Sequence, residues 1–180
     1  MGTGNILLMS AAFFSGFAIN HLLKRQTGAA TLKGFINEAL VKGLTGIHNA
    51  RLAIQHSKST NLKIFAQKIA DDYSMFNQRL IEIARLKNIK DCDIERCHQT
   101  AMADLIIYSK EKSFDQEYLD KSVEFNKQMT HFLKHSGQLT NPTLGELIAT
   151  ILQQLERHSV MAQELAHTLH TNSIPTSSAH

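Results

Sequence analysis

The side chains that could hold a metal centre lie mainly in the second half of the chain. A di-iron centre in a helical bundle takes a carboxylate from each of two helices and a Glu-x-x-His motif from each of the other two. The motif occurs at Glu164-x-x-His167 and again at Glu95-x-x-His98. No pair of core-facing glutamates completes the set. Solvated helix faces are therefore the favoured interpretation of both copies.

A second cluster combines thiols with an imidazole. Cys92, Cys97 and His98 are all residue types that bind zinc. A structural zinc site normally takes four ligands in a recognised spacing, which this cluster lacks. Two thiols in a connection between helices are the alternative interpretation. The two cysteines do not indicate a compartment, because they could be either disulfide-bonded or reduced.

Two further pairs of histidines have helical spacing. His131 and His135 are four residues apart, and His167 and His170 are three apart, so each pair shares a helix face. Either pair could chelate a transition-metal ion. Surface histidines are the favoured interpretation, and no cofactor is predicted.

The motifs of common catalytic machineries are missing from the sequence. It contains no Gly-x-Ser-x-Gly motif, no P-loop and no dinucleotide fingerprint. We therefore expect a protein that is not an enzyme. The formal charge of +3 comes from Lys and Arg residues that are interspersed with acidic ones. This dispersion argues against nucleic-acid binding, which needs concentrated positive charge.

The elements that must position these side chains are helical. The 180 residues suit one domain with a hydrophobic core, and the two prolines interrupt no long periodic stretch. Four stretches carry apolar residues at steps of three and four, the spacing of one helix face: Leu32–His56, Asn61–Asn88, Phe114–Lys134 and Thr143–His170. The predicted fold class is all-α, an antiparallel four-helix bundle with a short crossing helix in Ile94–Tyr108.

Several residues in these stretches carry more specific expectations. Thr31 and Thr60 are predicted N-caps, because a threonine hydroxyl can accept a free backbone N–H. Gly43 and Gly46 lie inside the first long helix, although glycine costs helix stability. Close approach of a neighbouring helix and simple tolerance are both open explanations.

His158 lies in the apolar seam of the last helix. A buried imidazole needs a hydrogen-bond partner, or its desolvation costs about 1–3 kcal/mol. Tyr73 lies in the apolar stripe of the second helix and carries a hydroxyl. We predict that Tyr73 and His158 approach each other as a polar pair in the core. The alternative is a histidine whose ring reaches solvent at a bundle end.

Short motifs follow one another in a defined order between Phe35 and Leu169. They are Phe35–Ala39, Arg51–Ala53, Lys63–Ile69, Asp71–Tyr73, Phe114–Leu119 and Leu155–His158. Their order and spacing resemble a bacterial family, domain of unknown function 4142 (DUF4142). The resemblance implies a ferritin-like four-helix architecture and association with the cell envelope. It implies no particular reaction.

The chain departs from the family pattern at polar positions. Family members usually have Asp-His where this chain has Asp72-Tyr73, and a histidine at the position of Asn126. A glutamate that is common in the family's first helix aligns with Gly46. Of the positions that the family could use for a metal or a small ligand, His158 is the one that clearly persists.

An apolar segment precedes the bundle. The fourteen residues Ile6–Ile19 are short for a membrane span and typical of a signal-peptide core. A membrane anchor, a cleaved export signal and an extra helix packed on the bundle are the three open alternatives. We expect an anchor or signal-like segment with a linker at residues 1–30, the bundle domain at 31–170 and a disordered tail at 171–180.

These observations favour a non-catalytic binding or scaffold protein of the envelope. We expect a protein partner, a membrane contact through Ile6–Leu23 and a membrane-associated or periplasmic location. The alternative is a ferritin-like metal-binding or redox protein that uses His158 and a transition-metal ion. No pattern in the sequence indicates an oligomeric state.

Overall fold

The computed structural model describes residues 32–89, 94–103, 113–135 and 142–172. This part of the chain forms five helices and no strand: α2 (Leu32–His56), α3 (Thr60–Leu86), α4 (Ile94–Ala103), α5 (Phe114–His135) and α6 (Pro142–Asn172). The predicted all-α class is confirmed. The four long helices begin and end within two residues of their predicted bounds.

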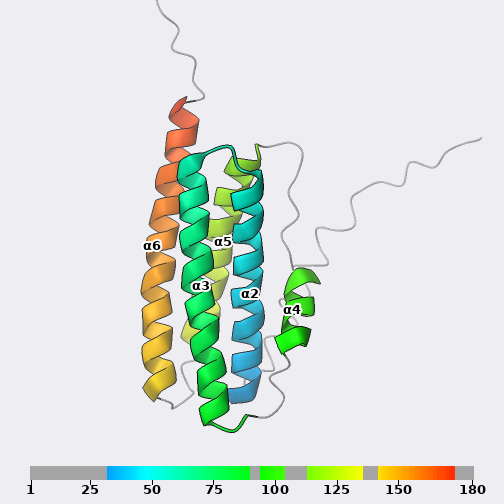
Figure 1. Ribbon diagram of the computed structural model, residues 1–180. Helices are drawn as coiled ribbons and strands as arrows, with labels where there is room; N and C mark the ends of the chain where they lie inside the picture. The colour runs from blue at the N-terminus through cyan, green and yellow to red at the C-terminus, as the bar shows by residue number, and fades with distance from the viewer. Residues whose placement is uncertain (1–31, 90–93, 104–112, 136–141, 173–180) are drawn as a thin grey trace, which may run out of the picture.

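The long helices form a four-helix bundle with α4 outside it (Figure 1). The first hairpin is α2 with α3 and the second is α5 with α6, both antiparallel. Because α3 and α5 run in the same direction, the chain must return along the bundle between the two hairpins. The second hairpin contacts the first through α3 with α6 and through α2 with α5. The short helix α4 packs on α2.

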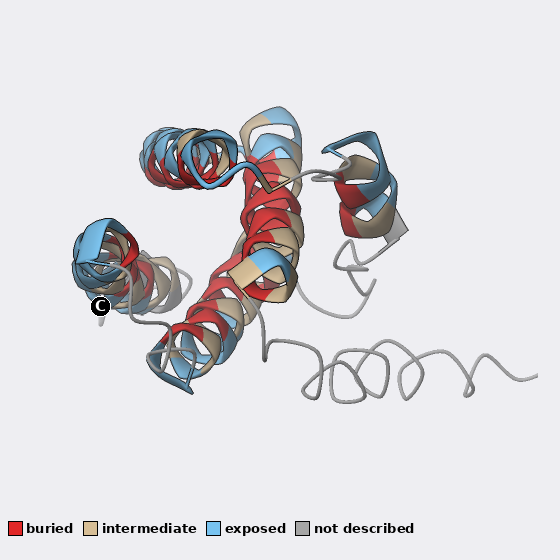
Figure 2. Cartoon of the chain, turned by 90° about the horizontal axis from the view of Figure 1, so that it is seen from below, coloured by how far each residue is buried: buried red, intermediate tan, exposed pale blue. Residues whose placement is uncertain are grey.

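The buried faces of the four long helices turn toward one another (Figure 2). Burial of apolar area stabilises this arrangement by about 1.5–3 kcal/mol for each large apolar side chain. The largest fully buried ones are Tyr73, Tyr118, Phe35, Phe65 and Phe76. Among the helices described, none is long and apolar enough to cross a membrane. The apolar segment Ile6–Leu23 lies outside the described residues.

Local backbone chemistry sets both ends of α3. The Ser59 hydroxyl caps the helix by accepting a hydrogen bond from the Leu62 N–H at 3.3 Å. The predicted cap Thr60 was wrong because Thr60 is already helical, whereas Ser59 has the extended backbone that a cap needs. At the other end, Asn88 has a φ of +52°, a left-handed conformation that a helix cannot continue through. Thr31 lies outside the described residues.

The two glycines of α2 allow α3 to approach closely. A Cβ at Gly43 would lie against the side-chain amide of Asn77, and a Cβ at Gly46 would lie 2.7 Å from the ring of Tyr73. Carbon atoms in contact normally lie about 3.5–4.0 Å apart. Close approach is therefore the explanation that the structure supports for both glycines.

We expect Gly46→Ala to lower the free energy of unfolding by up to about 2 kcal/mol, because the added methyl group overpacks the Tyr73 ring at a cost of about 1–3 kcal/mol. The higher helix propensity of alanine offsets roughly 1 kcal/mol of this cost. Gly145→Ala is the matched control, since a Cβ at this position in α6 meets no atom within 4 Å. Urea unfolding should show Gly145→Ala as stable as the wild type or more stable. Equal shifts in the two variants would contradict the packing explanation.

Candidate functional site

A buried hydrogen bond joins the two hairpins in the core. His158 of α6 donates from its Nε2–H to Oδ2 of Asp72 in α3, with 2.8 Å between the heavy atoms. The side chain of His158 is fully buried and Asp72 is 4% exposed. Because the carboxylate acts as the acceptor, the proton of the neutral ring is assigned to Nε2. The other ring nitrogen, Nδ1, is buried and meets no hydrogen-bond partner among the described residues.

Two further side chains complete the surroundings of the carboxylate. Gln154 donates from Nε2 to Oδ1 of Asp72 at 3.2 Å, and the Lys68 Nζ lies 3.2 Å from Oδ2. Lys68 precedes Asp72 by one turn of α3, and Gln154 precedes His158 by one turn of α6. Both carboxylate oxygens are thus engaged by side chains of this chain. A carboxylate buried without such partners would cost several kcal/mol.

The imidazole of His158 is kept neutral by its surroundings. Burial lowers the pKa of His158 below its ordinary value of 6.5, since a charged ring would lose its hydration. The hydrogen bond and negative charge of Asp72 raise the pKa but do not outweigh burial, while Lys68 and Arg157 lower it further. The pair is therefore a neutral imidazole hydrogen-bonded to a carboxylate at neutral pH.

Tyr73 lies next to this pair and fills the centre of the bundle. Its ring centroid is 6.5 Å from that of His158 and 6.0 Å from that of Phe125. Burial raises the pKa of Tyr73 far above its ordinary value, so the hydroxyl keeps its proton. The Tyr73 hydroxyl meets no hydrogen-bond partner in the described part of the chain. The structure thus brings the two predicted residues together, but Asp72 rather than Tyr73 is the hydrogen-bond partner of His158.

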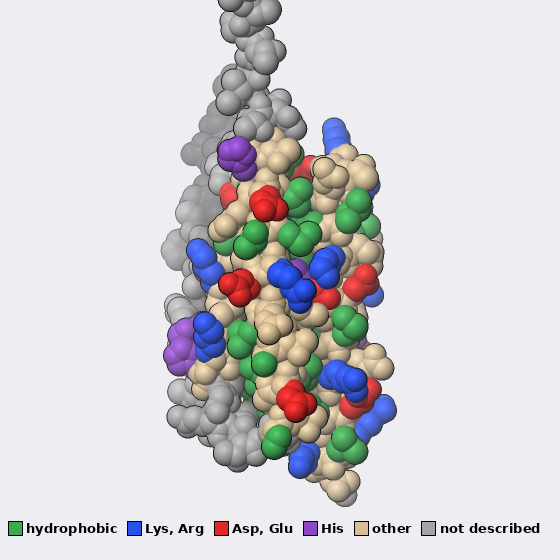
Figure 3. All heavy atoms as spheres, turned by 90° about the vertical axis from the view of Figure 1, so that its left-hand side faces the viewer, with side chains coloured by type: hydrophobic (Ala, Val, Ile, Leu, Met, Phe, Trp, Pro, Cys, Tyr) green, Lys and Arg blue, Asp and Glu red, His purple; other side chains and the backbone are tan. Residues whose placement is uncertain are grey.

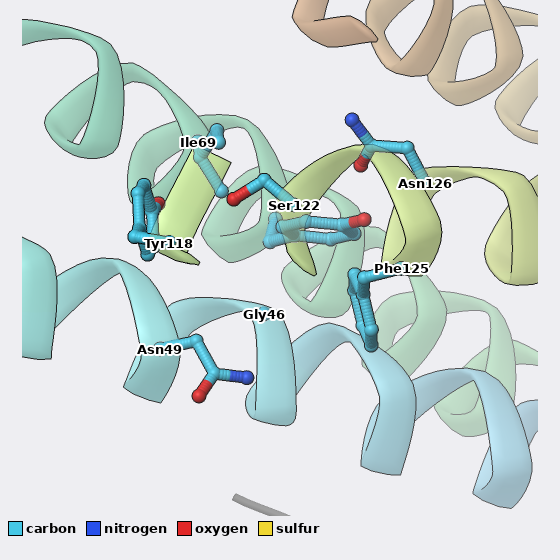
Figure 4. Close-up of a pocket in the computed structure, with 8 residues that line it drawn as sticks. Gly46, Asn49, Ile69, Tyr118, Ser122, Phe125 and Asn126 are labelled. Atoms are coloured by element: carbon cyan, nitrogen blue, oxygen red, sulfur yellow. The ribbon is translucent and has the colours of Figure 1, made fainter. Parts of the chain in front are cut away.

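A small cavity adjoins the Tyr73 ring. Its volume is about 20 Å³, which is room for one water molecule. Asn49 of α2 and Ser122 and Asn126 of α5 are among the residues that line it (Figure 4). Asn126 donates from Nδ2 to the Ser159 hydroxyl of α6 at 3.4 Å. The cavity lies between α2, α3 and α5, and most of its surface is apolar.

The three positions at which we expect this chain to depart from the family pattern meet at this cavity. Gly46, Tyr73 and Asn126 all line it, although they come from α2, α3 and α5. The Tyr73 ring fills the space above Gly46. These side chains form part of a tightly packed core.

The two Glu-x-x-His copies are not brought together, whereas the predicted pair His131 and His135 is. Glu164 and His167 are exposed on α6, whereas the second Glu-x-x-His copy lies on α4, which packs on α2. Exposed His131 and His135 lie side by side on α5, with ring centroids 4.0 Å apart. The side chain of His170 is outside the described part of the structure.

The two described members of the predicted thiol cluster, Cys97 and His98, contact different residues of α2. Cys97 is buried, and its Sγ lies 3.9 Å from the carbonyl oxygen of Asn37 in α2. The ring of His98 packs against His48 of α2, with centroids 5.8 Å apart. Cys92 lies outside the described residues. Within those residues, no three His, Cys, Asp or Glu side chains are grouped to hold a metal ion.

Sequence reasoning missed Asp72 as a member of the site. Phe65, Ile69, Asp72, Phe76 and Leu80 follow one another at steps of three and four, so they share one face of α3. A carboxylate in that buried series, paired with a histidine in the seam of α6, was the available signal. Assigning the face by apolar residues alone left Asp72 out.

A crossover between two antiparallel hairpins, with polar side chains inside the bundle, defines a ferritin-like helical-bundle protein. The chain belongs to the family described as domain of unknown function (DUF4142), whose family model matches residues 22–165. The resemblance inferred from the motifs is confirmed. No curated protein and no solved structure matches the chain. Membership in this family agrees with the observed helical bundle but indicates no reaction, so any function must be argued from the site itself.

We expect Asp72→Ala to lower the free energy of unfolding by about 2–5 kcal/mol, because it leaves the buried His158 N–H and Gln154 amide without their acceptor. The neighbouring Asp71→Ala is the matched control. Asp71 is exposed and accepts a hydrogen bond from the exposed Gln67, so its loss should cost no more than about 0.5 kcal/mol. Urea unfolding measures both variants. Similar losses in the two would show that the buried hydrogen bonds are not important for stability.

The lowered pKa of His158 predicts a fold that weakens in mild acid. Below about pH 6.5 the unfolded chain binds a proton at this ring more readily than the folded chain does. The free energy of unfolding should therefore fall as the pH decreases from 6.5 toward the folded pKa, by at most about 1.4 kcal/mol per pH unit from this group. Unfolding curves between neutral and mildly acidic pH should show a smaller slope in His158→Gln. An unchanged slope in His158→Gln would contradict the assignment.

Proposed function

We propose that this chain is a non-catalytic helical-bundle protein of the cell envelope that acts by binding another protein. The observation that supports this proposal best is that the buried carboxylate of Asp72 is fully engaged by the chain's own side chains. Asp72 accepts hydrogen bonds from His158 and Gln154 and pairs with Lys68. Interior groups that are committed to one another serve to hold the helices together.

The size of the interior cavity supports the same proposal. The cavity measures about 20 Å³, whereas pockets for small organic ligands measure roughly 300–1,000 Å³. A substrate of ordinary size would have to separate the helices around Tyr73 and Gly46 to enter. Binding on the outer helix faces needs no such rearrangement.

The alternative is a metal-binding or redox protein that uses His158 and a transition-metal ion. Metal centres in such bundles draw ligands from all four helices. Here Asp72 and His158 come from two helices, while Gly46 and Asn126 line the cavity from the other two. The Lys68 ammonium group, 3.2 Å from Asp72, would also repel a cation at that carboxylate. This donor set favours the binding proposal over the metal alternative.

The envelope part of the proposal rests on the N-terminal segment and on the family. Ile6–Leu23 is apolar and is followed by Lys24 and Arg25. An apolar segment of this kind suits an export signal or a membrane contact. A membrane-associated or periplasmic location would place the bundle among envelope proteins.

Metal analysis distinguishes the two functions. We expect the untagged full chain, after mild dialysis, to hold far less than one transition-metal ion per chain by mass spectrometry. The variants His158→Ala and His167→Ala should give the same result, the second being a control at an exposed position of α6. About one metal per chain that disappears only in His158→Ala would contradict the proposal and support the metal-binding alternative.

Partner binding is tested in cells with the full chain. Crosslinking should join the chain to the same envelope protein in the wild type and in Tyr73→Phe, which keeps the buried ring and removes its hydroxyl. Reconstitution of that pair from purified proteins is the confirming measurement. Failure of the purified proteins to bind would contradict the proposal.

A further inference from the structure

The outer flank of α3 carries a regular series of exposed side chains. We call it the α3 stripe, and it consists of Ile64, Lys68, Asp71, Met75, Arg79, Glu82 and Leu86. All of these residues are exposed except Glu82, which is partly exposed. Successive members are four, three, four, four, three and four residues apart. Steps of three and four place them on one side of the helix.

Three large apolar side chains lie at the ends and the middle of the α3 stripe. Ile64, Met75 and Leu86 are 62%, 55% and 78% exposed. They are eleven residues apart, a repeat that stays nearly in line on a straight helix. The line from the first to the last is about 33 Å long at 1.5 Å per residue. Single exposed apolar residues are ordinary, but a regular line of three indicates a surface that another helix can cover.

Charged side chains of both signs occupy the positions between the apolar ones. Lys68 and Asp71 lie between Ile64 and Met75, while Arg79 and Glu82 lie between Met75 and Leu86. The side of the molecule formed by α3 and α6 shows this mixture of apolar, positive and negative groups (Figure 3). Arg79 and Glu82 already form an ion pair with a 2.8 Å contact. The stripe therefore carries no excess charge of either sign.

The α3 stripe is complementary to itself when it is reversed. A two-fold axis through Met75 places each residue opposite the one at equal distance on the other side of Met75. Lys68 then lies opposite Glu82 of a second copy, and Asp71 lies opposite Arg79 of that copy. Ile64 lies opposite Leu86, so apolar groups meet apolar groups and each charge meets its opposite. Two-fold contacts of this kind are the usual basis of homodimers.

The opposite orientation does not have this property. In a parallel arrangement in register, each residue would lie opposite its own copy. Lys68 would face Lys68, and Asp71 would face Asp71, so four like-charge contacts would form along the line. Like charges opposite each other destabilise an interface. The charge pattern selects the antiparallel orientation.

From this symmetry we infer that the α3 stripe is a docking surface for a second copy of the chain, which packs antiparallel to α3 about a two-fold axis at Met75. The contact is a single helix line, which is small compared with obligate interfaces. The dimer is therefore weak and forms reversibly with rising protein concentration. This surface shares Lys68 with the polar core on which the proposed function rests, so the variants below change Asp71 and Arg79 instead.

Charge reversal tests the pairing of Asp71 with Arg79. Sedimentation equilibrium of the full chain should show a monomer–dimer equilibrium. Each dimer contains two contacts between position 71 of one copy and position 79 of the other. In Asp71→Arg, both contacts place two guanidinium groups opposite each other. In Arg79→Asp, both contacts place two carboxylates opposite each other. Each single variant should raise the dissociation constant about tenfold or more. The double variant D71R/R79D restores both opposite-charge contacts and should return the dissociation constant close to the wild-type value.

A cysteine on the symmetry axis gives an independent test. Oxidised Met75→Cys should form a covalent dimer, because position 75 lies opposite itself. Ile64→Cys should crosslink far less with its own copy, since position 64 lies opposite position 86. The wild-type chain, treated with the same oxidant, shows how much crosslinking Cys92 and Cys97 cause by themselves.

Several results would overturn the inference. One is that the chain stays monomeric at all concentrations. Another is that Asp71→Arg leaves the dissociation constant of the dimer unchanged, which is the result expected if the chains associate through residues 1–30. A folded double variant that fails to regain the dimer would also overturn it. Circular dichroism of each variant verifies that the helices are intact. None of these outcomes bears on metal content or on the heterologous partner, so this inference and the proposed function can fail separately.

Discussion

The hydrogen bond between Asp72 and His158 is the interaction on which the arrangement of the two hairpins depends. Apolar burial is non-directional, so it specifies the register of two helices less sharply than a buried polar contact does. A shift of α6 by one turn would leave the buried carboxylate of Asp72 with at most one of its two donors from that helix, His158 and Gln154. The cost of several kcal/mol for an unpaired buried carboxylate then selects one register of α3 against α6.

A second constraint acts between α2 and α3. Gly43 and Gly46 lie one turn apart on α2, and they face Asn77 and Tyr73, one turn apart on α3. Each glycine provides the space that a larger side chain of the neighbouring helix occupies. The hydroxyl of Tyr73 and both amide atoms of Asn77 meet no hydrogen-bond partner among the described residues, so these contacts stabilise through packing rather than polar pairing. This part of the bundle is thus a tightly fitted core beside a water-sized cavity.

The periodicity of apolar residues in the sequence was sufficient to predict the helices, but it was insufficient to predict which side chains form the site. The bounds of α2 follow directly from its apolar spacing, and the end of α3 shifts by two residues because Asn88 adopts a left-handed backbone. The hydrogen-bond partner of His158, unlike the helix bounds, cannot be predicted from local spacing. Asp72 is 86 residues away along the chain, and the choice between it and its neighbour Tyr73 depends on a rotation of α3 by one residue. Local spacing places both near the core, and only the packing of α3 on α6 decides which side chain reaches the imidazole.

The two sides of α3 are connected through Lys68. Its ammonium group pairs with the buried Asp72, yet 45% of its side chain is exposed and belongs to the α3 stripe. In the dimer that we infer, Glu82 of the second copy would compete with Asp72 for this charge. The positive charge of Lys68 also lowers the pKa of His158, because it disfavours a second cation beside the carboxylate. Drawing Lys68 outward would weaken that effect, so dimer formation at the α3 stripe would be coupled through this one side chain to protonation of His158 in the core.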